Sequence, residues 1–275
     1  MRKIAVPSVN YEPYRKLIPM RILALGDVVG RNAVNYLSDN LWKAREKYKA
    51  DLVIVNGENA SDVYGIDTED AKAILSAGAD VITLGNHAFG RKNIFPLLSD
   101  SESIIRPANY PPFTPGSGYT IVNICGWRVL CINVSGTAFM DALACPFATV
   151  DKILEREKDA YDIALMDVHA ESTSEKIALG RYFDGRIHVI FGTHTHVQTA
   201  DEQILPKGSG YITDLGMTGP TNGVIGADAA TVIERFRTKI SCRFTVASGE
   251  IRATGAIFDV DTTSKRVTSV SRVKI

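Results

Sequence analysis

The chain lacks any long apolar run and any clear leader segment. No apolar stretch in its 275 residues approaches the roughly 18–20 residues of a membrane-spanning helix. The basic start, Met1-Arg2-Lys3, is followed by a short apolar stretch that Pro7 and Asn10 interrupt, which is too weak for a signal peptide. These absences argue against a membrane protein and predict a cytoplasmic one.

The chain also lacks net charge and paired cysteines. The chain has 31 Lys and Arg residues and 31 Asp and Glu residues. Its net charge therefore exerts no long-range attraction on nucleic acid, although local basic patches are compatible with this balance. None of the four cysteines forms a C-x-x-C pair, and Cys125 and Cys131 stand in apolar, strand-like runs. This pattern favours buried free thiols over disulfides or a structural zinc site.

Regular patterning begins after residue 19. Residues 1–19 contain Pro7, Pro13 and Pro19 without periodicity, and we interpret them as an N-terminal extension before a single domain at 20–275. Short apolar runs then alternate with stretches of helical spacing. The expected strands are 22–25, 52–55, 81–84, 119–124, 128–134, 163–166 and 189–191, with a strand-rich end at 243–275. The expected helices are 33–48, 68–77, 174–181 and 229–239.

The order of these elements predicts an α/β fold. Strand, helix and strand repeat in the first part of the chain, which favours parallel strands joined by right-handed crossovers. A hairpin is expected near Gly126-Trp127, between two later strands. We therefore expect one α/β domain with two sheets and helices outside them.

Polar residues follow the ends of the expected strands. Because ligands bind beyond the carboxyl ends of strands in open α/β sheets, these residues are candidates for a site. They are Gly26-Asp27, Asn56-Gly57-Glu58-Asn59, Gly85-Asn86-His87, Asp167-Val168-His169 and Gly192-Thr193-His194-Thr195-His196. Four of the five histidines belong to this set, and we interpret the fifth, His188, as structural.

The types of side chain indicate a metal centre. Carboxylates, carboxamides and three imidazoles suit divalent manganese, iron or zinc better than magnesium or calcium, which prefer oxygen ligands. Seven candidate ligands are too many for one tetrahedral ion, but they suit two ions that share a bridging carboxylate. The carboxylates are Asp27 and Glu58, the carboxamides are Asn59 and Asn86, and the imidazoles are three of the four histidines at the strand ends. His194 and His196 both reach the site only if their segment curves, because alternate residues of a strand point apart.

The motifs resemble the calcineurin-like metallophosphoesterases, and in particular their YmdB-like branch. The resemblance covers residues 20–275 and is strongest in three blocks near the C-terminal half. These blocks are Asp167-Val168-His169-Ala170-Glu171, Gly192-Thr193-His194-Thr195-His196-Val197-Gln198-Thr199-Ala200-Asp201 and Ile212-Thr213-Asp214-Leu215-Gly216-Met217-Thr218-Gly219-Pro220.

This resemblance implies a four-layer αββα sandwich of two mixed sheets and a phosphodiesterase that acts on nucleotides, including cyclic ones. It implies that Asp27, Asn59 and His196 hold one ion, that Glu58 bridges, and that Asn86, His169 and His194 hold the second. Iron or manganese are the metals it implies, with a metal-bridging hydroxide as nucleophile. His87 would bind no metal and would donate a proton to the leaving oxygen.

The chain departs from the wider superfamily at two places. Val29 stands where the first motif usually has a histidine, and Asn59 would supply the replacement ligand. Phe89 and Gly90 stand where close relatives tend to carry a tryptophan and an acidic residue.

Two segments near the expected ligands have more than one interpretation. Asp214 and the glycine-rich loop at 216–226 would lie near the site by the same resemblance, and a purely structural turn is an equal alternative. Glu171 and Ser172 would either orient His169 or cap the helix that is expected to begin near Ser174.

Two other functions remain open on sequence grounds. A phosphomonoesterase such as a 5′-nucleotidase would use the same metal centre, and only the pocket distinguishes it. A regulatory RNA-binding protein with a vestigial metal site is the alternative from a different class, and pairs such as Arg235 and Arg237 would offer it a local basic patch. A homo-oligomer is also possible.

Overall fold

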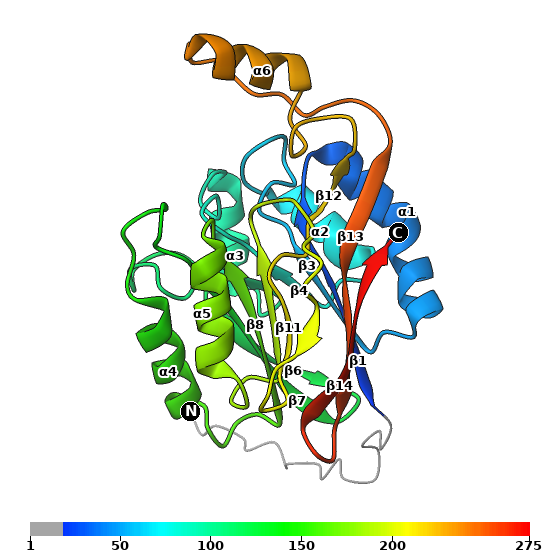
Figure 1. Cartoon of the computed structure of the whole chain (residues 1–275), viewed down its shortest axis with the longest axis vertical. Helices are drawn as coiled ribbons and strands as arrows, with labels where there is room; N and C mark the ends of the chain where they lie inside the picture. Colours follow the sequence, from blue (N-terminus) through cyan, green and yellow to red (C-terminus); the bar gives the residue numbers. More distant parts are fainter. Residues whose placement is uncertain (1–18) are drawn as a thin grey trace, which may run out of the picture.

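The computed structural model describes residues 19–275, so most of the expected N-terminal extension lies outside the described residues. Within this range the chain forms two mixed sheets with helices on their outer faces (Figure 1). The first sheet contains β1 (Met20–Leu25), β2 (Asp27–Val28), β3 (Leu52–Asn56), β4 (Val81–Thr83), β5 (Ile104–Ile105), β12 (Met217–Pro220), β13 (Ile251–Asp261) and β14 (Arg266–Lys274). The second contains β6 (Tyr119–Ile124), β7 (Trp127–Ser135), β8 (Ile163–His169), β9 (Val189–Thr193), β10 (Gln203–Ile204) and β11 (Gly210–Ile212).

Each sheet has a parallel centre, as the strand–helix–strand pattern predicts. In the first sheet β1, β3, β4 and β5 run parallel, while β13 joins β1 in the antiparallel sense. In the second sheet β7, β8, β9 and β11 run parallel, with β6 antiparallel at one edge. Parallel strands end at the same edge, so the polar residues after them gather along one side of the sandwich.

The helices are α1 (Arg31–Tyr48), α2 (Thr68–Ser76), α3 (Phe95–Asp100), α4 (Pro146–Arg156), α5 (Thr173–Phe183) and α6 (Ala229–Thr238), with a short 3-10 helix η2 (Lys92–Ile94). In α1, Leu37 and Leu41 are one turn apart and both are buried, so one stripe of the helix faces the first sheet. Asp67 accepts a hydrogen bond from the Asp70 amide and caps the start of α2.

Three hydrophobic cores separate four layers. The first core joins α1 and α2 to the outer face of the first sheet, the second fills the space between the sheets, and the third joins α4 and α5 to the second sheet. The strand β1 shows the alternation: Leu23 faces the first core, and Ile22 faces the second. The expected αββα sandwich of two mixed sheets is therefore confirmed.

Two sequence expectations need correction. Cys131 is a buried free thiol, but Cys125 and Cys145 are exposed and Cys242 is only partly buried. Cys125 is exposed because it occupies the turn between β6 and β7, with a φ of 52°. The expected helices do not include α4, although Pro146 at its start and the spacing of Val150, Ile153 and Leu154 are helical signals. Within residues 19–275, no helix is long and apolar enough to cross a membrane.

Candidate metal centre

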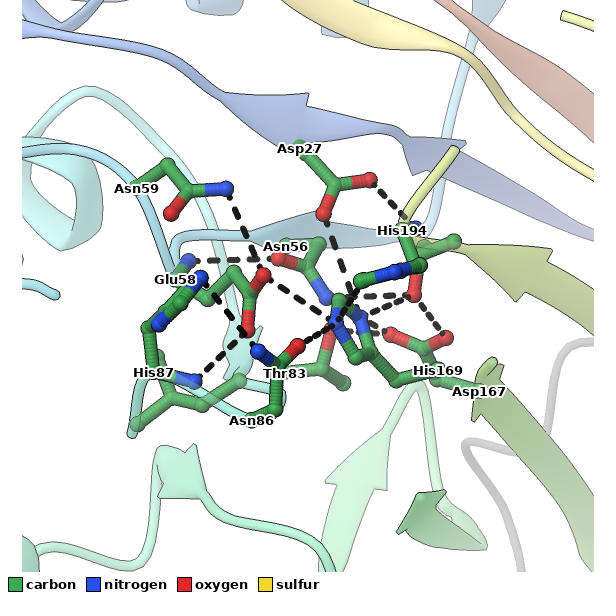
Figure 2. Close-up of polar contacts among 12 residues, drawn as sticks. Asp27, Asn56, Glu58, Asn59, Thr83, Asn86, His87, Asp167, His169 and His194 are labelled. Carbon is green, nitrogen blue, oxygen red and sulfur yellow. Dashed lines mark hydrogen bonds and ion pairs between the residues drawn. The ribbon is translucent and has the colours of Figure 1, made fainter. Parts of the chain in front are cut away.

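All seven predicted ligands and His87 lie at the common edge of the two sheets (Figure 2 shows six of the ligands together with His87). The first sheet contributes residues that follow β1, β3 and β4, and the second contributes residues at the ends of β8 and β9. Glu58, His169 and His194 place one ligand atom each within 4.8 Å of one another, which is the spacing of a possible metal site. The site therefore brings together side chains from both halves of the sandwich.

His169 lies at the centre of this group and is fully buried. Its Nε2 atom is 3.0 Å from Glu58 Oε1, 3.0 Å from Asn86 Oδ1 and 3.0 Å from His194 Nδ1. A single ring nitrogen cannot make ideal hydrogen bonds to three such groups at once, whereas a cation between them would satisfy all four atoms. Figure 2 shows these contacts converging on the His169 ring.

The outer nitrogen of each imidazole contacts an acceptor, which fixes the ring and its tautomer. His169 Nδ1 donates to Thr193 Oγ1 at 2.9 Å, because the Thr193 hydroxyl itself donates to Asp167. His194 Nε2 is 3.0 Å from Glu171 Oε2, and His196 Nδ1 donates to the Ile225 carbonyl at 2.8 Å. The inner nitrogens then turn their lone pairs toward the site, as in histidines that bind metal ions.

Two buried oxygens at the site have no hydrogen-bond partner: Asp27 Oδ1 and Asn59 Oδ1. An unsatisfied buried carboxylate or carboxamide oxygen is costly unless a cation binds it. The other oxygen of Asp27 accepts from the His194 amide at 3.0 Å, and Asn59 Nδ2 lies 3.2 Å from His196 Nε2. Rotation of the Asn59 side-chain carboxamide about its last bond exchanges the positions of its nitrogen and oxygen. These donor types and orphaned oxygens fit divalent metal ions.

The carboxylates of the site stabilise a positive charge at His169 Nε2, which is either a proton or a cation that takes its place. Burial opposes ionisation of Glu58, yet the attraction and hydrogen bond of His169 lower the pKa of Glu58 to about 2. Burial also acts against the charged imidazole, but Glu58 and then Asp27 raise the pKa of His169 to about 9. Burial raises the pKa of Asp27 to about 6, against the effect of His196 and His169. The site thus attracts a cation even though its surroundings are buried.

The segment that carries His194 and His196 curves, as expected from their joint placement. Both residues have positive φ angles, 98° and 64°, a region that non-glycine residues rarely adopt. Asp214 holds the segment from behind, because it accepts from the Thr195 amide at 3.1 Å and from Thr195 Oγ1 at 2.8 Å. Lys176 from α5 forms a buried ion pair with the same Asp214 oxygen at 2.6 Å. Asp214 therefore supports the ligand segment.

A buried polar layer beneath the site is built from Asn56, Asp167 and Thr193, which stand among the strand-end candidates, and from Thr83, which sequence reasoning missed. Asp167 accepts hydrogen bonds from Thr83, Thr193 and Asn56, and Thr193 connects it to His169. Thr83 ends a buried strand, where it resembles an ordinary β-branched residue. Nothing in its local sequence marks it as part of a metal centre.

Three residues near the ligands have structural or supporting positions. Glu171 contacts a histidine, as one of its two interpretations expects, but the histidine is His194 and not His169. Ser172 caps α5, which is the structural alternative for that residue. The structural interpretation of His188 fits its contact with the Ala164 amide, which donates to Nδ1.

His87 lies beside the ligands and lines a cavity of about 390 Å³. Its Nε2 accepts from Asn86 Nδ2 at 3.3 Å, and its ring packs edge-on against Tyr64 with centroids 4.7 Å apart. Burial lowers the pKa of His87 from its ordinary value, so the free imidazole is favoured until a negative group approaches. Phe89 takes no part in this contact and packs on Phe95 and Tyr110.

Fold and site together define a metallophosphoesterase-like protein: two sheets in an αββα sandwich carry a His, Asn and carboxylate cluster at their common edge. The known families agree with this class. The model of the YmdB-like protein family matches residues 23–273, and the chain belongs to that family.

Two of the similar proteins are named as a phosphodiesterase or a phosphatase. A 2′,3′-cyclic-nucleotide 2′-phosphodiesterase of Bacillus subtilis (strain 168) is 43% identical over 256 residues, which cover 93% of this chain and 97% of that protein. The crystal structure of a novel phosphatase from Mycoplasma pneumoniae has a TM-score of 0.89 at 34% identity and covers 94% of both chains. A hypothetical protein from Thermus thermophilus has a TM-score of 0.87 at 40% identity, covering 93% of this chain and 99% of its own.

Proposed function

We propose that this protein is a two-metal phosphodiesterase that hydrolyses cyclic nucleotides, with 2′,3′-cyclic nucleotides as the first substrates to examine. The observation that carries this proposal is the orientation of the three imidazoles. Each outer nitrogen is engaged by Thr193, Glu171 or Ile225, and each inner nitrogen is left for a cation. The named activity of the Bacillus subtilis relative supports the choice of substrate.

The proposed ligand sets follow the two groups of contacts. One ion would be held by Asp27, Asn59 and His196, a second by Asn86, His169 and His194, with Glu58 between them. Two divalent ions, iron or manganese by preference and zinc as the alternative, would supply a water-derived nucleophile at neutral pH and offset charge on the phosphate. The residues from 20 to 275 would form this single catalytic domain.

The chain itself would supply the proton and the geometry. The negative phosphate diester raises the proton affinity of His87 when it binds, which counteracts the effect of burial. The protonated ring then donates from Nε2 to the leaving ribose oxygen, which replaces the Asn86 amide as the partner of that nitrogen. Tyr64 packs against the ring and restricts its rotation.

The proposal is tested by metal analysis together with hydrolysis assays. Purified protein is expected to contain about two metals per chain after iron or manganese is restored, and to hydrolyse adenosine 2′,3′-cyclic phosphate and bis-p-nitrophenyl phosphate. The Asp27→Asn and His169→Ala variants are expected to lose metal and activity together. Absence of both metal and activity after reconstitution would contradict the proposal. Faster hydrolysis of p-nitrophenyl phosphate than of the diester would favour a phosphomonoesterase instead.

A further inference from the structure

The cavity beside His87 extends into an apolar chamber that the reaction at phosphorus does not need. The whole cavity is about 390 Å³, within the roughly 300–1,000 Å³ that encloses small organic ligands. Part of its wall is formed by site residues such as Glu58 and His196. The rest of its wall is mainly apolar, and includes Val63, Tyr64, Ile225, Val232, Phe236 and Phe244. A ligand held at the metal centre would therefore extend into apolar surroundings.

Helix α6 provides part of this wall. Figure 1 shows the helix beyond the edge of both sheets, separated from the helices that flank them. Val232 is its buried residue, whereas Phe236 lines the cavity and still leaves 69% of its surface exposed. An exposed aromatic ring on the wall of a reaction cavity offers a flat surface that a second flat ring would cover.

The charges of the wall distinguish between possible ligands. Among the described residues that line the cavity there is no lysine or arginine, and Glu171 adds a carboxylate to those of the site. Arg235 and Lys239 lie over the Phe244 and Phe236 rings without lining the cavity themselves. A nucleic acid strand would carry further phosphates into this space, and phosphates are bound by basic side chains. An uncharged nucleobase instead suits aromatic walls, because its faces stack on phenyl and phenol rings.

We propose that Phe236 and Phe244, together with Tyr64, form a nucleobase subsite for a mononucleotide whose cyclic phosphate lies at the metal centre. This inference rests on the proposed function and narrows its substrate to single nucleotides. Tyr64 connects the two regions, since its ring contacts His87 and also lines the apolar chamber. Phe236 is then a specificity-determining residue at the outer end of the substrate.

The test compares two substrates that differ only in the base: adenosine 2′,3′-cyclic phosphate and methyl riboside 2′,3′-cyclic phosphate. Phe236→Ala is expected to lower kcat/KM for the adenosine compound by about five- to 150-fold, the range that corresponds to the loss of one base–aromatic stack. It is expected to leave the methyl riboside unchanged. Phe236→Leu keeps an apolar wall without a flat ring. Its kcat/KM for the adenosine compound should therefore lie between that of the wild type and that of Phe236→Ala.

Ile240→Ala is the matched control. Ile240 follows α6, is 69% exposed like Phe236, and is not among the residues that line the cavity. Its replacement is expected to leave kcat/KM unchanged for both substrates. Phe236→Ala and Ile240→Ala should both fold, because exposed side chains contribute little to stability.

Two kinds of result would overturn the subsite. An equal loss of kcat/KM on both substrates in Phe236→Ala, or no loss on either, contradicts the assignment. A higher kcat/KM for an oligonucleotide ending in a cyclic phosphate than for the mononucleotide also contradicts it. If metal-loaded wild-type protein hydrolyses neither cyclic phosphate, the proposed function itself fails, and this failure is distinguishable because it is seen without any variant.

Discussion

Replacement of Lys176 by methionine is expected to destabilise the protein and weaken its metal site together. Lys176 Nζ is 2.6 Å from Asp214 Oδ2, and both side chains are only 1% exposed. Methionine retains most of the length of the side chain, so the change removes the charge and leaves the Asp214 carboxylate buried without its cation. The remaining donors to Asp214 are neutral groups of Thr195 and Gly216.

The size of the effect follows from the geometry of the pair. At an effective dielectric constant of about 20, unit charges at this distance attract by roughly 6 kcal/mol, and the cost of desolvating both ions offsets part of that attraction. Removal of one partner from a buried pair typically costs about 3–5 kcal/mol in the free energy of unfolding. We expect Lys176→Met to fall in that range. The double variant with Asp214→Asn should cost less than the sum of the two single changes.

Urea unfolding measures the first effect, and a titration with manganese followed by elemental analysis measures the second. Manganese affinity should fall because Asp214 supports Thr195, which lies between His194 and His196. Lys152→Met on the exposed face of α4 is the control and should stay within about 0.5 kcal/mol. A cost below about 1 kcal/mol for Lys176→Met, or additive single changes, would refute the buried-pair reasoning.

Three further changes test the site and the pH dependence of stability. His87→Ala should keep both metals while turnover falls about 10²–10⁴-fold; metal loss on elemental analysis would contradict its role as proton donor. Gly85→Ala should abolish metal binding, because a Cβ there would lie 2.1 Å from Glu58 Oε2 and 2.2 Å from His169 Nε2; retention of about two metals per chain would contradict this. Burial lowers the pKa of His188 to about 4 from 6.5, so the unfolded chain binds this proton more readily and stability should fall as pH drops through that interval. His188→Gln should flatten that part of the unfolding profile, and an unchanged profile would argue against His188.

The sandwich and the group of ligands were predictable because both depend on local pattern. Apolar runs such as 52–55 mark strands covered on both faces, and the polar residues directly after them must emerge at one edge. Glu58 and His169 therefore could be placed together although 111 residues separate them. Their separation of 3.0 Å could not be predicted, because it depends on how the two sheets pack.

Other parts of the site have no local signal. Thr83 looks like an ordinary strand residue, and only the packing of both sheets brings it to Asp167. The exposure of Phe236 was equally hidden, because a helix with apolar residues at this spacing is expected to bury them. What the sequence leaves open is thus the surroundings of the candidate ligands rather than their placement at one edge.

The division of the ligands between two sheets has a consequence for biosynthesis. The proposed oxygen ligands all lie in residues 27–86, and the proposed imidazole ligands begin 83 residues after Asn86, at His169. A chain that emerges from the ribosome in this order first exposes carboxylates and carboxamides alone, which bind transition metals weakly. The full coordination set exists only after both sheets have paired and packed. On the proposed ligand assignment, metal capture would therefore be a late event in maturation, and a half-made chain would not sequester the ions.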